Sequence, residues 1–197
     1  MPRAGEDQDT WDQRRGPAGR TGRKGARVSA DTITHVVVPG TFDPVTLGHI
    51  DVIRRTRRLF PRVTVAVAAS ANKNGRGTTF TLDERVEMIR EALALEGLPD
   101  DIDVQPFTGL LVSFCSQIGA GGVVKGLRAM TDFEYELQQA DLNSHLSPEI
   151  ESVFVMSSPE YGYVSSSIVR EIASMGSDVS ILVTANVAER LREHYRS

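Results

Sequence analysis

The sequence predicts an α/β protein with a Rossmann-like, open, parallel sheet of five strands and helices on both faces. Short β-branched runs alternate with longer amphipathic stretches after residue 30, as in βαβ units with right-handed crossovers. The first, second and last of these runs are almost continuously apolar, which is typical of strands buried on both faces of a parallel sheet. We expect the strands at Thr34–Val38, Val63–Ala69, Asp103–Phe107, Val123–Lys125 and Val153–Met156.

Helices are expected between the strands, where apolar residues recur at helical spacing. They fall at Leu47–Phe60, Thr81–Leu95, Leu110–Ile118 and Asp132–Leu146. Thr81 and Glu84 form the pattern of a capping box at the start of the second helix, and Pro148 ends the fourth. Open parallel sheets bind ligands outside the carboxyl ends of their strands, so a site is expected in the segments that follow the strands.

Composition narrows the class of protein. The chain has 197 residues, of which 40% are hydrophobic and 24% charged, close to the globular average. It has no apolar run of 18 residues that would predict a membrane span. Its single cysteine, Cys115, excludes an internal disulfide framework and fits the reducing cytoplasm. The four histidines lack the spacing of a zinc site, and the net charge of −4 gives no reason to expect nucleic acid as the main partner.

The first thirty residues differ in character from the rest. They carry seven Lys or Arg and four acidic residues, a net charge of +3 that leaves −7 for residues 31–197. Because they show neither helical nor strand periodicity, we predict a disordered basic extension over residues 1–30 and one folded domain over residues 31–197. Such an arm can contact RNA or another anion; the alternative is a dispensable extension or a start codon assigned too early.

The first chemically informative segment follows the first strand, where Pro39–His49 reads PGTFDPVTLGH. Thr46 is placed to cap the next helix, and we expect Gly48 to keep side-chain atoms away where the main chain meets a ligand. His49 then lies in the first helical turn, where N–H groups and the helix dipole attract phosphate. Taken alone, such a histidine is more often structural. The whole eleven-residue string is a much more specific signal of function than the histidine by itself.

The second segment lies at the fourth strand, which we expect to end at Lys125. The run Lys125-Gly126-Leu127-Arg128 then places two cations at the carboxyl edge of the sheet, with Gly126 leaving room for a phosphate. We expect the strand end to point Lys125 and Arg128 toward two different substrates. On an ordinary surface, cations at this spacing are usually only solvated.

The third segment follows the fifth strand, where Tyr161–Ser167 reads YGYVSSS and opens a further helix. Its serines offer hydroxyl and main-chain N–H groups to a chain of phosphates. The alternative is that the serines serve only to cap the helix.

Together, the three segments resemble one known family. The strings Gly-Thr-Phe-Asp-Pro and Thr-x-Gly-His within Pro39–His49 are similar to the signature of the nucleotidylyltransferase superfamily. Within that superfamily, the run GLRAMTDFEYE at Gly126–Glu136 is similar to the phosphopantetheine adenylyltransferase family. The resemblance extends from about His35 to Tyr195.

The resemblance implies an enzyme of coenzyme A biosynthesis that transfers AMP from ATP to 4′-phosphopantetheine, giving dephospho-coenzyme A and pyrophosphate. It implies His49 and Thr41 as catalytic residues that contact the transferring phosphoryl group. ATP would bind to Thr41, Phe42, His49, Gly126, Leu127, Arg128, Glu136, Tyr161, Gly162, Tyr163, Val164, Ser165, Ser166 and Ser167. Phosphopantetheine would bind to Thr41, Lys73, Leu111 and Lys125. The resemblance also implies Mg²⁺ bound through the ATP phosphates, a homohexamer and a cytoplasmic enzyme.

One alternative is a related nucleotidylyltransferase with another phosphorylated acceptor, such as nicotinate mononucleotide or glycerol phosphate. Lys73, Leu111 and Lys125 argue against it, because they match the acceptor side of the resembling family. Residues 74–79 form a longer loop than that family usually has, which bears on the position of Lys73.

A second alternative, from a different class, is a catalytically silent nucleotide-binding module that uses the basic extension to bind RNA. Thr41, His49 and Arg128 argue against it, because the residues that match the family's reacting site are intact. The chain has no Gly-x-x-x-x-Gly-Lys-Ser/Thr string, so a P-loop is not expected.

Overall fold

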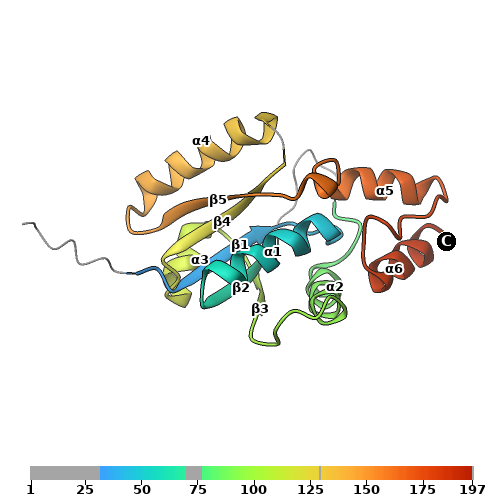
Figure 1. Cartoon of the computed structure of the whole chain (residues 1–197), viewed down its shortest axis with the longest axis horizontal. Helices are drawn as coiled ribbons and strands as arrows, with labels where there is room; N and C mark the ends of the chain where they lie inside the picture. The colour runs from blue at the N-terminus through green and yellow to red at the C-terminus, as the bar shows by residue number, and fades with distance from the viewer. Residues whose placement is uncertain (1–31, 70–76, 129, 197) are drawn as a thin grey trace, which may run out of the picture. The chain divides into compact units, whose positions relative to one another are not determined.

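The computed structural model describes residues 32–69, 77–128 and 130–196; the predicted extension over residues 1–30 and Lys73 lie outside the described residues. The described chain forms a parallel five-stranded sheet with the strand order β3-β2-β1-β4-β5 (Figure 1). The strands are β1 (His35–Gly40), β2 (Arg62–Ala68), β3 (Asp103–Phe107), β4 (Gly122–Leu127) and β5 (Glu151–Met156). The predicted fold class is therefore confirmed.

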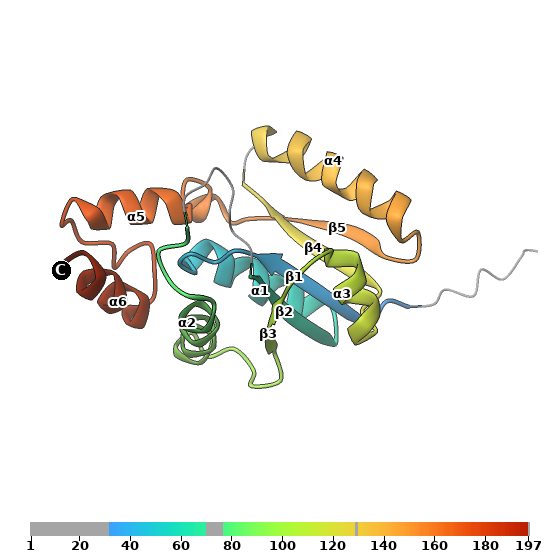
Figure 2. The ribbon, with the colours of Figure 1, turned by 180° about the vertical axis from the view of Figure 1, so that it is seen from behind.

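Helices follow the strands in the predicted alternation. They are α1 (Leu47–Leu59), α2 (Leu82–Leu95), α3 (Leu111–Ile118), α4 (Met130–Leu146), α5 (Ser166–Ser174) and α6 (Ala185–Arg196), with a short 3₁₀ turn, η1, at Pro159–Tyr161. Helix α1 lies on the face of the sheet seen in Figure 1, and α3 lies on the face seen in Figure 2. Within the described part of the chain, every helix is too short or too polar to cross a lipid bilayer.

Strand β1 shows why the strand runs are so apolar. Val36 and Val38 are buried in the larger core, which α1, α2, α5 and α6 complete. Val37 is buried in a smaller core on the opposite face, with Phe114 and Cys115 of α3. Successive side chains of a strand point to opposite faces of the sheet. Where both faces are covered, the residues at odd and at even positions of the strand must therefore all be apolar.

The fourth strand is longer than predicted. The expectation that it ends at Lys125 is wrong, because β4 continues to Leu127 and pairs Gly126 and Leu127 with Val155 and Met156 of β5. Lys125 therefore lies inside the strand. Ladder pairing with a neighbouring strand prolongs β4, and the local sequence, with a charge and a glycine, gives no sign of it.

Helix α4 packs against two strands of the sheet. It lies along β4 and the edge strand β5, where Phe133 meets the ring of Phe154 at 5.9 Å between centroids. Phe133 and Leu137 nevertheless remain 38% and 41% exposed. The apolar side of α4 is thus only partly covered within this chain.

Candidate active site

A cavity of about 660 Å³ opens at the carboxyl ends of β1 and β4. The chain runs from β1 through β2 to β3 on one side and then returns to place β4 on the other side of β1. The cavity therefore lies at the point where the strand order reverses, the usual ligand position in such sheets. The starts of α1 and α5 and part of α4 complete its wall.

The structure brings most of the predicted site residues together in this wall. They are Thr41, Phe42, His49, Leu111, Lys125, Gly126, Arg128, Glu136, Val164, Ser165, Ser166 and Ser167. Four predicted residues lie beside the wall: Leu127 is buried, Tyr161 packs against Gly48, Gly162 lies close to Arg128, and Tyr163 is largely exposed. Lys73 falls outside the described residues, so its position is not part of this geometry.

The turn after β1 has an unusual backbone. Phe42 has φ = 49°, in the left-handed region that residues with a side chain rarely adopt. Its ring stacks edge-on against His49 at 5.0 Å between centroids. A Cβ on Gly40 would lie 2.8 Å from the Phe42 ring, so the glycine makes room for this arrangement.

His49 forms part of the N-terminal cap of α1. The Thr46 side chain accepts a hydrogen bond from His49 N, as predicted for a capping residue, and Thr46 N donates to Nδ1 of His49 at 3.0 Å. Because Nδ1 accepts a main-chain N–H, the proton of the neutral ring is on Nε2. Burial and the charge of Arg128 lower the pKa of His49 to about 4. The wall therefore contains a neutral imidazole that can donate one hydrogen bond.

The two cations of the second motif point to different elements of the fold. Lys125 Nζ lies 3.2 Å from Glu136 Oε2 on α4, whereas Arg128 donates from Nη1 to the carbonyl of Val164 at 2.9 Å. Lys125 thus approaches the cavity from the side of α4, and Arg128 from the side of α5. Among the described wall residues, Glu136 is the only carboxylate, so the wall carries a net positive charge.

Of the two motif glycines Gly48 and Gly126, only Gly126 has a packing reason, and the sequence did not reveal it. A Cβ on Gly126 would lie 2.6 Å from a methyl group of Val52 on α1, which is closer than real contacts allow. A Cβ on Gly48 would lie 3.4 Å from Cβ of Tyr161. Gly126 lets α1 pack tightly against β4, whereas the distance at Gly48 is that of an ordinary van der Waals contact.

The three serines have distinct contacts. Ser165 caps α5 by accepting from Ile168 N at 3.2 Å, and Ser166 donates to the carbonyl of Pro44 at 2.8 Å. Ser166 therefore ties the start of α5 to the turn after β1, while Ser167 lines the cavity. The N-termini of α1 and α5 meet at one cavity, and their dipoles favour an anion there.

Two residues behind the wall were not predicted. Asp43 accepts hydrogen bonds from Thr79 N and Phe80 N and pairs with Arg170 of α5. Arg85 of α2 is buried and donates to the carbonyl of Thr41. The available signal for Arg85 was its place on the apolar face of a helix, where a charged side chain needs a partner.

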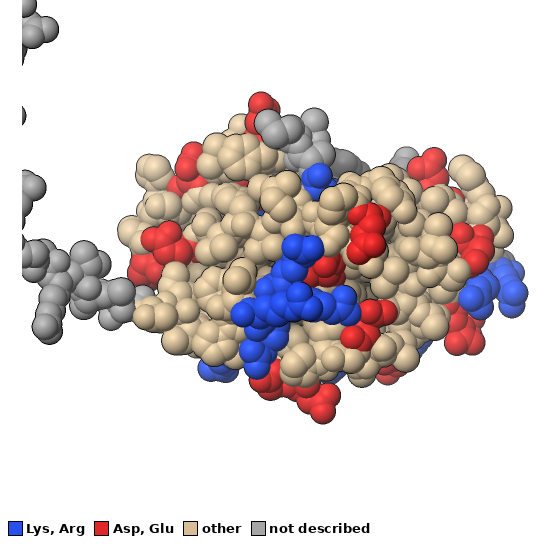
Figure 3. Space-filling model, in the orientation of Figure 1, with Lys and Arg blue, Asp and Glu red and all other residues tan. Residues whose placement is uncertain are grey.

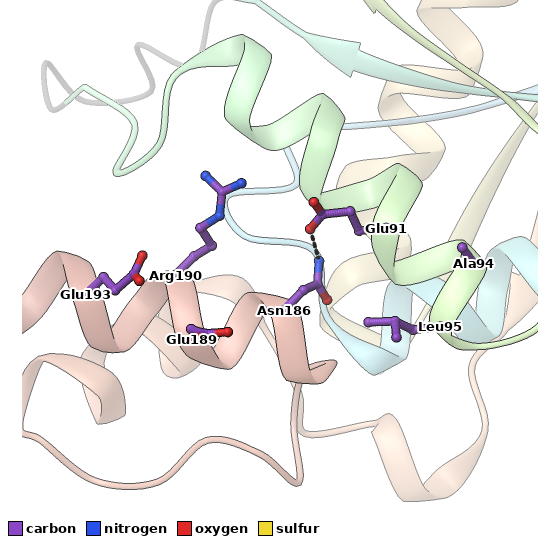
Figure 4. Close-up of a pocket in the computed structure, with 7 residues that line it drawn as sticks. All are labelled: Glu91, Ala94, Leu95, Asn186, Glu189, Arg190 and Glu193. Atoms are coloured by element: carbon purple, nitrogen blue, oxygen red, sulfur yellow. Dashed lines mark hydrogen bonds between the residues drawn. The ribbon is translucent and has the colours of Figure 1, made fainter.

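Two other features of the surface differ chemically from the cavity wall. The patch of Lys and Arg in the middle of Figure 3 lies over α1, where Arg54 pairs with Glu96 and Arg57 pairs with Asp101. A second hollow, between α2 and α6 (Figure 4), is lined by three glutamates and one arginine, with Asn186 donating to Glu91 at 2.9 Å. In the first feature the arginines pair with carboxylates, and in the second the glutamates outnumber the arginine.

The chain is similar in sequence to known proteins. Residues 37–172 match the family model described as cytidylyltransferase-like. The chain is 50% identical over 160 residues to a phosphopantetheine adenylyltransferase of Thiobacillus denitrificans, covering 81% of this chain and 96% of that protein. It is 49% identical over 156 residues to the phosphopantetheine adenylyltransferase of Thioalkalivibrio sulfidiphilus, covering 79% and 94%.

Solved structures support the fold alone. A Vibrio parahaemolyticus protein described as a nicotinate-nucleotide adenylyltransferase aligns with a TM-score of 0.62 at 18% identity, over 84% of this chain and 97% of that one. A bifunctional NMN adenylyltransferase/ADP ribose pyrophosphatase of Francisella tularensis aligns with a TM-score of 0.59 at 16% identity, over 84% and 52%.

Proposed function

This chain belongs to the phosphopantetheine adenylyltransferase family, and we propose that it transfers AMP from ATP to 4′-phosphopantetheine, giving dephospho-coenzyme A and pyrophosphate. The observation that carries the proposal is the identity of about half the residues over nearly the whole length of two relatives of that name. The cation-lined cavity at the switch point of the sheet supports it.

In the proposed reaction, a phosphate oxygen of the acceptor attacks the α-phosphorus of ATP while the bond to pyrophosphate breaks. The acceptor phosphate is already ionised, so the chain need not supply a nucleophile. Its work is to align two phosphorylated substrates and to stabilise the charge that develops between them. A wall with two cations and two helix N-termini suits both tasks.

We assign His49 and Thr41 to the transferring phosphoryl group. Nδ1 of His49 is engaged by Thr46 N, so Nε2–H is the edge that can donate to a phosphoryl oxygen. Because the pKa of His49 is lowered to about 4, the ring acts as a neutral donor at physiological pH. It stabilises charge without transferring a proton.

The remaining assignments follow the two sides of the cavity. Lys125, on the side of α4, would hold the acceptor phosphate, together with Lys73, and Leu111 would line the path of the pantetheine arm. Arg128 and Ser165–Ser167, on the side of α5, would hold the β- and γ-phosphates of ATP. The other residues that the family resemblance implies as ATP-binding remain part of this proposal.

Magnesium is proposed to enter with the nucleotide. Mg²⁺ prefers oxygen ligands and is commonly held through nucleotide phosphates with few protein carboxylates. The described wall offers one carboxylate, Glu136, which Lys125 already pairs, so the phosphates would supply most ligands. When bound, the ion would reduce the negative charge of the triphosphate.

The oligomeric state of the enzyme and its place in the cell are part of the same proposal. We propose a homohexamer, supported by the apolar side chains that α4 leaves exposed, among them Leu137, Leu142 and Leu146. We place the enzyme in the cytoplasm, where ATP is abundant and where Cys115, a buried free cysteine, stays reduced.

The deciding experiment measures pyrophosphate release from ATP with a panel of acceptors. The panel contains 4′-phosphopantetheine, dephosphorylated pantetheine, nicotinate mononucleotide and glycerol phosphate. We expect turnover with 4′-phosphopantetheine alone, together with formation of dephospho-coenzyme A. Preferred use of another phosphorylated acceptor would favour the related-nucleotidylyltransferase alternative, and ATP binding without any turnover would favour the silent module.

A further inference from the structure

We propose that Arg85, a buried residue behind the cavity wall, is a positioning residue for adenylyl transfer. Its guanidinium holds the main chain at Thr41 and thereby sets the turn that carries the phosphate-facing residues. The inference rests on the proposed function for its kinetic consequence, whereas its structural consequence can be measured without substrate.

Arg85 joins the ends of two neighbouring strands. Its side chain is 1% exposed, and Nη1 donates to the carbonyl of Thr41 at 2.6 Å and to that of Ala68 at 3.0 Å. Thr41 follows β1, Ala68 is the last residue of β2, and both line the cavity. One nitrogen therefore fixes two segments of the wall that lie far apart in the sequence.

Burying the charged side chain of an arginine at this position costs free energy. Met88 and Ile89, which follow at helical spacing on the same face of α2, are fully buried apolar residues. Desolvation lowers the pKa of Arg85, and the charge of Asp43 acts in the opposite direction. A buried charge often stabilises a protein less than an apolar residue of similar size. The arrangement is therefore better explained by what the guanidinium holds than by stability.

The turn is attached to the start of α2 at a second point. The Asp43 carboxylate accepts from Thr79 N at 2.9 Å and from Phe80 N at 3.0 Å, just before the helix. Phe42 lies between the two attachments in its left-handed conformation and packs edge-on against His49. A shift of the Thr41 carbonyl would therefore be transmitted to Phe42 and to the contact with His49.

The kinetic test compares three variants. Arg85→Met removes both hydrogen bonds, Arg85→Lys keeps a charged donor, and Arg90→Met is the matched control. Arg90 is on the same helix and donates to the carbonyl of Val104 in β3 at 2.9 Å, away from the cavity wall. All rates are measured at a temperature at which each variant is folded, as shown by its melting curve.

We expect Arg85→Met to lower kcat by about a hundredfold, the cost of a misplaced reacting group, with KM for ATP nearly unchanged. Arg85→Lys should recover much of that loss, and Arg90→Met should keep a kcat close to that of the wild type. If Arg85→Met does not fold, Arg85→Gln replaces it, with the same expected loss in kcat. A kcat near wild type in the folded Arg85 variant would overturn the proposal.

Amide hydrogen exchange separates this inference from the proposed function. Without substrate, the peptide that covers residues 38–43 should exchange faster in Arg85→Met than in the wild type or in Arg90→Met. If the wild type transfers no adenylyl group, the proposed function fails. In that case, the exchange result still decides whether Arg85 holds the turn, because equal exchange in all three proteins would overturn the inference.

Discussion

His49 has a structural and a chemical role at the same residue. Its Nδ1 and main-chain N–H complete the capping box of α1 with Thr46, and this fixes both the rotamer and the tautomer of the ring. Nε2–H is then the donor at a helix N-terminus, where phosphate is favoured. The two interpretations weighed for this histidine, structural and catalytic, are compatible because each uses a different edge of the ring.

Replacing His49 by alanine should lower turnover much more than it lowers ATP affinity. Loss of one donor aimed at developing charge costs about 10²–10³ in rate, whereas the ground-state phosphates keep their other contacts. Steady-state kinetics and ATP titration of His49→Ala measure the two effects, with His145→Ala, an exposed histidine on α4, as control. Near-normal turnover of His49→Ala would contradict the role assigned to it.

The free energy of unfolding should fall as the pH is lowered from 7 to 5. His49 is neutral in the folded state above about pH 4, whereas the unfolded chain takes up its proton near pH 6.5, so acid favours unfolding. The contribution of His49 is on the order of 2 kcal/mol over this range. Buried His35, whose pKa is lowered by desolvation and by Arg62, acts in the same direction.

Urea unfolding at pH 7 and pH 5 tests the effect of His49. His49→Gln should lose less stability between the two pH values than the wild type does, and His145→Gln should behave like the wild type. An equal loss in all three proteins would show that His49 is already protonated in the folded chain at pH 5.

At the scale of elements, β4 combines packing and binding through the alternation of its side chains. Gly126 faces α1, where its missing side chain accommodates Val52. Lys125 faces the opposite side, where it pairs with Glu136 of α4. Arg128, one residue past the strand, turns toward Val164. One strand end thus supplies the two sides of the proposed substrate site.

This alternation predicts separable effects of the two cations. Lys125→Ala should mainly weaken the use of phosphopantetheine, and Arg128→Ala should mainly weaken the use of ATP. Each loses a charge-assisted contact worth about 1.5–3 kcal/mol, or roughly ten- to a hundredfold. Kinetics with each substrate varied in turn measure the split. Equal effects of both variants on both substrates would mean that the cations serve one shared phosphate cluster.

The contact between α1 and β4 predicts the effect of a single methyl group. Gly126→Ala should lower the free energy of unfolding by about 1–3 kcal/mol, the usual cost of overpacking, because the new Cβ meets Val52. Gly77→Ala is the control, since a Cβ there meets nothing within 4 Å. Adding Val52→Ala should make the effect of Gly126→Ala smaller in a double-mutant cycle. Equal stability of the Gly126 and Gly77 variants would refute this account.

At the scale of the whole described fold, the site lies where the strand order reverses, and helix α4 leaves an apolar surface exposed. The cavity lies where β1 and β4 are neighbours, with Gly126 of β4 facing α1 and Lys125 pairing with Glu136 of α4. On the outer side of β4 and β5, α4 keeps several large apolar side chains exposed. Exposed apolar surface of this kind marks interaction sites in globular proteins.

The proposed hexamer makes α4 the element to test. Leu142, which is 52% exposed on α4, changed to Asp should shift the protein toward smaller species in sedimentation velocity. Leu95, which is 61% exposed on α2, changed to Asp is the control and should leave the assembly intact. The prediction fails if the wild type is a monomer, or if both variants sediment like the wild type.

The sequence by itself determined the fold class and the motif-bearing segments. Continuous β-branched runs and helical periodicity are local signals of burial, and the capping box of Thr81 and Glu84 formed as predicted. The segments Pro39–His49, Lys125–Arg128 and Tyr161–Ser167 were found for a similar reason, because turns and helix starts have strong local preferences. The parallel order of strands then placed these segments near one edge.

Only the tertiary structure decided the contacts that depend on residues far apart in the chain. The length of β4 depends on pairing with β5, and the need for Gly126 depends on Val52. The positioning contact of Arg85 joins residues 44 and 17 positions away. Such contacts leave no periodic trace in the sequence, because they are set by which strands become neighbours and by how closely the helices pack on them.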